Sequence, residues 1–100
     1  MKINNYFITA EFKNSNNENN IALKKSLNDA KFKSSVISNN NIVYKLTNAM
    51  YRFDSEFEIE DVLDKVKKIA FKIDSNEENI IITVTKSEGS FWFNLDVITE

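Results

Sequence analysis

The side chains that most enzymes use for catalysis are largely missing from this chain of 100 residues. It contains no His, no Cys and no Pro, and only one Gly, at position 89. A thiol nucleophile, a disulfide framework and the usual zinc, copper and iron–sulfur sites are therefore excluded. The sequence has no Gly-rich loop that would bind phosphate. Carboxylates, lysines, hydroxyls and amides remain, and they leave room for acid–base chemistry or for oxygen-ligated Mg²⁺ or Ca²⁺.

The densest group of ionisable side chains lies between residues 54 and 64, a segment without any basic residue. Its carboxylates are Asp54, Glu56, Glu58, Glu60, Asp61 and Asp64. One interpretation is an acidic patch that docks on a basic protein surface, as an inhibitor that mimics nucleic acid does. The other is the solvated start of a helix, where the macrodipole favours acids. The ligand spacing of a calcium-binding loop is absent. We take these six acids as the candidate partner-binding site, with no catalytic and no metal-binding residue.

The single tryptophan, Trp92, is the seventh candidate for partner binding. An exposed Trp is a frequent anchor at protein interfaces, and the alternative is cross-strand packing on the outer face of a sheet. The strand aromatics Tyr6, Phe7, Tyr44, Tyr51 and Trp92 raise the alternative of a sheet that stacks on single-stranded nucleic acid. The segment 89–94 lacks the basic and second small residues of the matching RNA-binding motif.

Two weaker patterns point toward nucleic-acid chemistry. Glu11 and Lys13 have the Glu-x-Lys spacing of some metal-dependent nucleases, but the upstream Asp that such a site needs is absent. A basic group at Lys24, Lys25, Lys31 and Lys33 either contacts phosphate or forms a solvated helix face. The net charge of −2 and a single arginine argue against nucleic acid as the partner.

Two helices would position the polar groups. Residues 55–73 carry an apolar stripe at helical spacing, and Ser55 with Glu58 has the spacing of a capping box. The stripe consists of Ile59, Val62, Leu63, Val66, Ile69, Ala70 and Ile73. A second helix, with a narrower stripe, is expected from Asn17 or Glu18 to Ala30.

The remaining segments predict strands, because apolar and polar residues alternate in them or β-branched residues dominate. These segments are 6–12, 42–46, 49–53, 80–85 and 91–97, and residues 35–38 form a short apolar piece before the second of them. We expect the last two to pair as a hairpin that turns at Gly89.

The order β-α-β-β-α-β-β predicts an α+β fold in one domain over residues 1–100. The expected architecture has two helices on one face of a mostly antiparallel sheet of four or five strands. It corresponds to a ferredoxin-like βαββαβ arrangement with an extra C-terminal hairpin strand. The alternative is a longer meander flanked by helices.

Composition adds an expectation about origin and partner. Abundant Lys, Asn and Ile, with one Arg, indicate an A+T-rich genome, such as that of a low-G+C bacterium, its phage or its plasmid. In length, codon bias and acidity the chain is similar to small phage proteins that block host enzymes, anti-CRISPR proteins among them. No stretch approaches the ~20 apolar residues of a spanning helix, and no signal peptide is evident. We therefore expect a cytoplasmic, non-enzymatic inhibitor or regulator without a cofactor, which occludes a basic surface of a host protein. The alternatives are the nucleic-acid-binding sheet and a structural homo-oligomer such as a homodimer.

Overall fold

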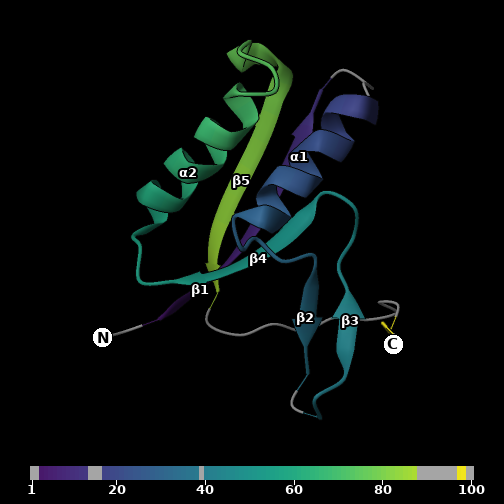
Figure 1. Ribbon diagram of the computed structural model, residues 1–100. Coiled ribbons are helices and arrows are strands. Elements are labelled where there is room, and N and C mark those ends of the chain that lie inside the picture. Colours follow the sequence, from purple (N-terminus) through teal and green to yellow (C-terminus); the bar gives the residue numbers. More distant parts are fainter. Residues whose placement is uncertain (1–2, 14–16, 39, 88–96, 99–100) are drawn as a thin grey trace.

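The computed structural model describes residues 3–13, 17–38, 40–87 and 97–98. In this part of the chain the elements follow the order β1, α1, β2, β3, β4, α2 and β5, with a short 3₁₀ helix, η1, before β5 (Figure 1). The described residues form two helices and two antiparallel sheets, one of three strands and one of two. The α+β class predicted from the sequence is confirmed.

The three-stranded sheet is built around β1 (Asn4–Phe12), which lies between β4 (Met50–Ser55) and β5 (Ile80–Ser87). Both outer strands run antiparallel to β1. The connection from β4 through α2 to β5 therefore crosses over β1 before it returns to the sheet. This places the most N-terminal strand between two strands from the second half of the chain.

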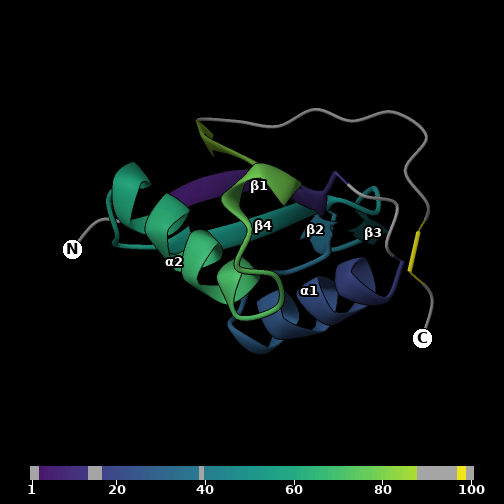
Figure 2. The same ribbon diagram turned by 90° about the horizontal axis from the view of Figure 1, so that it is seen from above.

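Both helices, α1 (Asn17–Asp29) and α2 (Ile59–Phe71), cover the same face of this sheet (Figure 2). Alternate residues of β1 point toward them, because successive side chains of a strand face opposite sides. These residues are Tyr6, Ile8, Ala10 and Phe12, each at most 4% exposed. Leu23 and Leu27 of α1 join them in one core.

The apolar stripe of α2 faces the sheet as the sequence predicts. Val62, Val66 and Ala70 are fully buried against it. The start of the helix differs from the prediction, because α2 begins after Glu58 and no side chain caps it. Ser55 instead continues β4, where it pairs with Asn4. The predicted capping box between Ser55 and Glu58 is therefore wrong.

The second sheet is a ribbon of β2 (Ser35–Ile37) and β3 (Val43–Lys45) that extends away from the helices (Figure 1). Just before β2, Lys33 exchanges two backbone hydrogen bonds of 2.7 Å with Arg52 of β4. After this single bridge the chain leaves β4 and pairs with β3. The described residues thus form two sheets in place of the one sheet of four or five strands that was expected, and the ferredoxin-like strand order is not confirmed.

The C-terminal hairpin expected between residues 80–85 and 91–97 is wrong for the one residue of its second strand that can be placed. Val97 forms an antiparallel bridge with Tyr44, and the Ile98 N–H donates to the Val43 carbonyl over 2.8 Å. These two residues therefore extend the ribbon beside β3 and do not pair with β5. The turn at Gly89 and residues 91–96 lie outside the described residues.

Candidate functional site

The six candidate acids come from the end of β4, the loop that follows it and the first turns of α2. All six side chains are exposed to solvent. The structure divides them, because Asp54 follows the buried Phe53 in β4 and therefore points away from the helices. Glu60, Asp61 and Asp64 lie on the outer face of α2, opposite its buried stripe.

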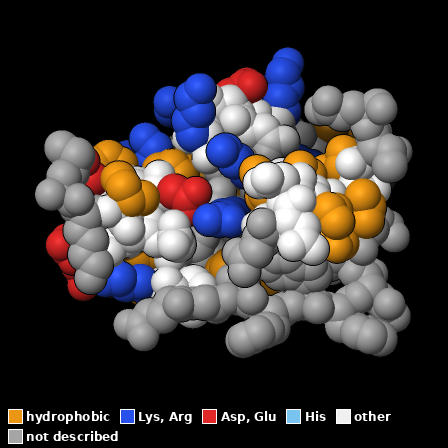
Figure 3. Space-filling model, turned by 90° about the horizontal axis from the view of Figure 1, so that it is seen from below, with side chains coloured by type: hydrophobic (Ala, Val, Ile, Leu, Met, Phe, Trp, Pro, Cys, Tyr) orange, Lys and Arg blue, Asp and Glu red, His pale blue; other side chains and the backbone are white. Residues whose placement is uncertain are grey.

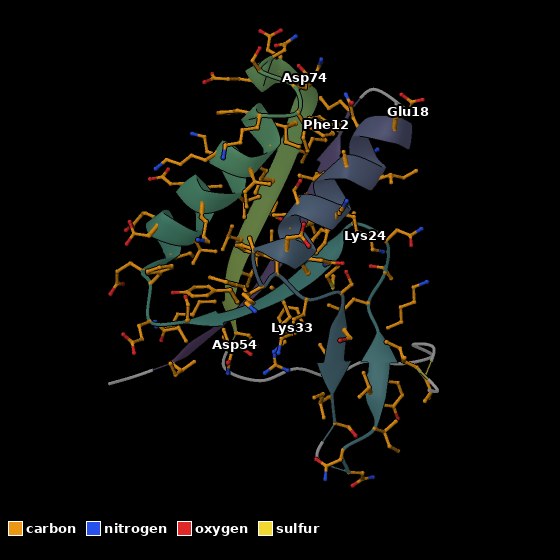
Figure 4. All side chains as sticks on the ribbon, in the orientation of Figure 1. Phe12, Glu18, Lys24, Lys33, Asp54 and Asp74 are labelled. Atoms are coloured by element: carbon orange, nitrogen blue, oxygen red, sulfur yellow. The ribbon has the colours of Figure 1, made fainter. Side chains whose placement is uncertain are left out.

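Asp54 belongs to a mixed cluster of charges on the open face of the sheet. Its carboxylate Oδ1 accepts a hydrogen bond from Nε of Arg52 at 3.2 Å, which is also an ion pair. Lys33 stands opposite Arg52 across the strands, so its side chain is on the same face. Figure 4 places Asp54 and Lys33 at the same end of the sheet. The charge of Asp54 is thus partly offset, and we separate it from the other five acids.

The remaining acids form what we call the acidic group, which consists of Glu56, Glu58, Glu60, Asp61 and Asp64. Among the described residues none of these carboxylates forms an ion pair. Glu60 and Asp64 are four positions apart on α2, so two like charges stand on one helix face. Figure 3 shows red acidic side chains at the left of the underside, next to blue ones, and further red among the blue side chains across the middle. The acidic group is therefore an exposed set of negative charges without ion pairs among the described residues.

The loop that carries Glu56 and Glu58 is held in place by β1. The Tyr6 hydroxyl donates a hydrogen bond of 2.5 Å to the Phe57 carbonyl, and Nδ2 of Asn4 donates to the same oxygen at 3.4 Å. The Phe57 N–H donates to Oγ of Ser55 at 3.2 Å. Because Tyr6 is buried in the core, this hydrogen bond connects the loop to the core side of the sheet.

Phe57 is an aromatic side chain at the centre of the acidic group that the sequence interpretation did not select. The residue is 46% exposed. Its ring lies 6.4 Å from the ring of Phe53, and Nζ of Lys65 is 5.8 Å from its centroid. The signal that could have identified it is an aromatic residue directly between two acids in an otherwise polar run.

Two of the aromatic residues named from the sequence for stacking on nucleic acid are placed differently from what was expected. Trp92 lies outside the described residues. Tyr6 and Tyr51 are 1% and 2% exposed and face the helices, so neither can stack on a base. Burial also raises the pKa of the Tyr51 hydroxyl above its ordinary value. The nucleic-acid alternative thereby loses Tyr6 and Tyr51. Phe7 and Tyr44 are half-buried, and Phe7 lies on the sheet face away from the helices.

The Glu-x-Lys pattern considered from the sequence lies at the end of β1. Phe12, between Glu11 and Lys13, is buried in the core while its two neighbours are exposed. No group of three or more acids in the described part of the chain is arranged to hold a metal ion. A groove of about 350 Å³ between α1 and α2 is lined by Ser26, Asp29, Ala30, Ile69, Lys72 and Ile73.

The basic group proposed from the sequence is spread over three elements. Lys24 and Lys25 lie on α1, Lys31 follows that helix with a positive φ of 76°, and Lys33 bridges to β4. Lys24 is half-buried and the other three are exposed. Figure 4 shows Lys24 on the side of α1 and Lys33 near the lower end of the sheet.

Comparison with protein families, curated proteins and solved structures gives no match for this chain. No helix among the described residues has both the length and the apolar character to cross a membrane. The charge and geometry of the acidic group are therefore the features of this chain that bear on its function.

Proposed function

We propose that this chain is a small non-enzymatic regulator or inhibitor that binds a host protein and occludes a basic surface used for nucleic acid. The observation that carries the proposal is the acidic group, whose carboxylates are exposed and form no ion pairs within the described residues, around the fixed and half-exposed Phe57. Carboxylates on a surface compete with phosphates for the same lysines and arginines. The compositional likeness to phage proteins that block host enzymes supports an anti-defence role of the anti-CRISPR type.

Phe57 supplies the apolar anchor of the proposed interface, which the charged side chains do not provide. Exposed charges at an interface mainly steer association and set specificity, whereas a desolvated aromatic anchor contributes most of the affinity. The hydrogen bonds from Tyr6 and Asn4 fix the backbone of Phe57 before the partner arrives. A loop that is already ordered loses less entropy on binding. Phe57 therefore joins the acidic group in the proposed contact surface.

The proposal is tested by neutralising Glu56, Glu58, Glu60 and Asp61 together, to Gln or Asn. The partner is first isolated from host lysate with the wild-type chain. We expect the affinity of the variant to fall roughly 30-fold, from about 0.5 kcal/mol for each exposed charge. The salt dependence of binding should fall with it, and duplex DNA should compete with the wild-type chain for the partner. Isothermal titration calorimetry at two salt concentrations measures the first two effects.

A matched pair of double variants separates position from net charge. Glu56→Gln/Glu60→Gln and Glu11→Gln/Asp29→Asn each remove two exposed acids. Only the first pair should weaken the complex. An unchanged affinity in the fourfold variant, or equal losses in both double variants, contradicts the proposal.

A further inference from the structure

The outer edge of β5 offers backbone groups to which no described strand is paired. The Lys13 N–H donates to the Asn79 carbonyl over 2.6 Å, which identifies this pair as hydrogen-bonded in the β1–β5 ladder. Hydrogen-bonded and non-bonded pairs alternate along an antiparallel ladder. The N–H and C=O groups of the odd-numbered residues therefore point to β1, and those of Ile80, Ile82, Val84 and Lys86 point outward.

The sequence of β5 does not protect this edge. Edge strands usually carry Pro, several charges or a bulge that blocks further pairing. β5 runs over eight residues without Pro or Gly, and Lys86 is its only charged residue. The strand is rich in Ile, Val and Thr, whose β-branched side chains favour a sheet. Such an edge is a template for another strand.

A groove runs beside the edge, between β5 and the flank of α2. Its volume is about 270 Å³, and it is lined by Leu63, Lys67, Phe71, Glu77, Ile80 and Ile82. The three α2 residues follow one another at intervals of four, so they form one flank of that helix. All three are half-buried. The opposite flank of α2, at Ile69, already faces α1, as does Ile73 just beyond the end of the helix.

The charges at the two ends of β5 are opposite. Glu77 and Glu78, both exposed, lie in η1 (Glu77–Asn79) directly before the strand, and Lys86 is exposed near its end. When two copies of such a strand pair antiparallel, each basic end meets the acidic end of the other. The edge is therefore complementary to itself in charge.

We propose that the outer edge of β5 pairs antiparallel with β5 of a second copy of this chain, forming a two-fold dimer with one continuous six-stranded sheet. A two-fold axis at Ile82 pairs the outward-facing residues with one another and sets Lys86 opposite Glu78 of the partner subunit. The two α2 helices then lie side by side, about 8–10 Å apart as packed helices do. Leu63 and Phe71 become buried between them.

A second copy fits this site better than an isolated peptide strand. A single strand would pair with the edge but would bring no helix to cover the flank of α2 that lines the groove. The second copy brings both a strand and a helix, and the two-fold arrangement uses both edges so that the assembly closes. The dimer does not depend on the acidic group, since none of its residues lines the groove. Neutralising the acidic group should leave the dimer intact.

The dimer is tested by sedimentation equilibrium and by charge reversal. We expect a mass of twice 11.6 kDa. Lys86→Glu alone, or Glu77→Lys with Glu78→Lys, should raise the dissociation constant about tenfold, because both symmetric contacts become repulsive. The variant with all three changes should regain the wild-type constant. Lys68→Glu on the outer face of α2 makes the same charge change away from the edge and should have no effect.

A second variant addresses the backbone pairing itself. Proline at Val84 removes an N–H that points away from β1, so the fold should persist while pairing with the second copy is lost. Circular dichroism confirms folding, and sedimentation should then show a monomer. A wild-type chain that stays monomeric, or a dimer that responds to neither the charge reversals nor Val84→Pro, overturns the proposal. Slow hydrogen exchange at residues 82 and 84 in a monomer would show that the chain itself covers the edge, and would overturn it too.

Discussion

The two edges of the three-stranded sheet are built in opposite ways. At β4 the backbone N–H and C=O of Arg52 are hydrogen-bonded to the backbone of Lys33. The side chains of Arg52 and Asp54 also place charges along this strand. At β5 no described strand is paired, and β-branched residues dominate. The β4 edge also receives an aromatic contact from the core, since the rings of Phe32 and Phe53 stack at 4.1 Å. The β4 edge is thus covered at Arg52 by the chain's own contacts, whereas no described strand covers the β5 edge.

The difference follows from the residues that come next in the chain. After α1 the chain returns to β4 at Phe32 and Lys33, and a single bridge covers that edge at Arg52 before the ribbon begins. Val36 and Leu46 are buried outside the main core, so the ribbon has apolar contacts of its own. Those contacts favour pairing of β2 with β3 over a longer pairing with β4.

The largest loss of stability is expected when the aromatic contact at the β4 edge is removed. Phe53→Ala removes a ring that is 6% exposed and stacked on Phe32. We expect the free energy of unfolding to fall by about 3–5 kcal/mol, as for other buried Phe truncations. The backbone amides of Lys33 and Arg52 should also exchange faster. Urea denaturation and hydrogen exchange measure the two effects. Val84→Ala on the half-buried β5 face is the comparison, and an equal loss there would contradict the contrast between the edges.

A loss of stability of intermediate size should distinguish the β5 amides that point to β1 from those that point outward. Thr83 directs its N–H to β1, so Thr83→Pro breaks the ladder and should cost about 3 kcal/mol or more. Val84 directs its N–H outward, and Val84→Pro should cost about 1–2 kcal/mol, mainly for lost side-chain packing. Unfolding is followed at protein concentrations below the dissociation constant of the dimer. If the two variants are equally unstable, the assignment of inward and outward amides is wrong.

The smallest effect concerns the turn that leads into β5. The Asp74 carboxylate accepts hydrogen bonds from the Asn76 N–H at 2.9 Å and from Nδ2 of Asn79 at 3.0 Å. These bonds, the backbone one foremost, lower the pKa of Asp74 below its ordinary value of 3.8. A lowered folded-state pKa stabilises the fold above 3.8 and loses that contribution as the pH falls through the folded pKa.

Asp74→Asn should therefore be less stable than the wild type at neutral pH. The difference should shrink as the pH falls below 3.8, because the wild-type carboxylate becomes protonated. Urea denaturation over a series of pH values checks this. A difference that stays constant across the series would show that the charge of Asp74 has no part in holding the turn.

The acidic group shows which structural properties the spacing of residues along the chain can predict. The exposure of its side chains follows from a polar run at the start of an amphipathic helix, and the structure agrees. The exact start of α2 did not follow, because Ser55 pairs with Asn4 and Tyr6 holds the Phe57 carbonyl. Those partners are about fifty residues away in sequence, so spacing within the run cannot reveal them.

The amino-acid sequence by itself determined the approximate positions of both helices and of β1, β3, β4 and β5, because periodicity and β-branched runs act over a few residues. It also determined which functional groups the chain can use, since no fold can supply the side chains of His and Cys that the sequence lacks. Only the tertiary structure decided which face each strand buries, so that Tyr6 and Tyr51 lie in the core. It likewise decided that Val97 joins β3 and that the strands divide into two sheets. Such choices depend on competition between distant segments for the same apolar contacts and backbone hydrogen bonds, which no local pattern records.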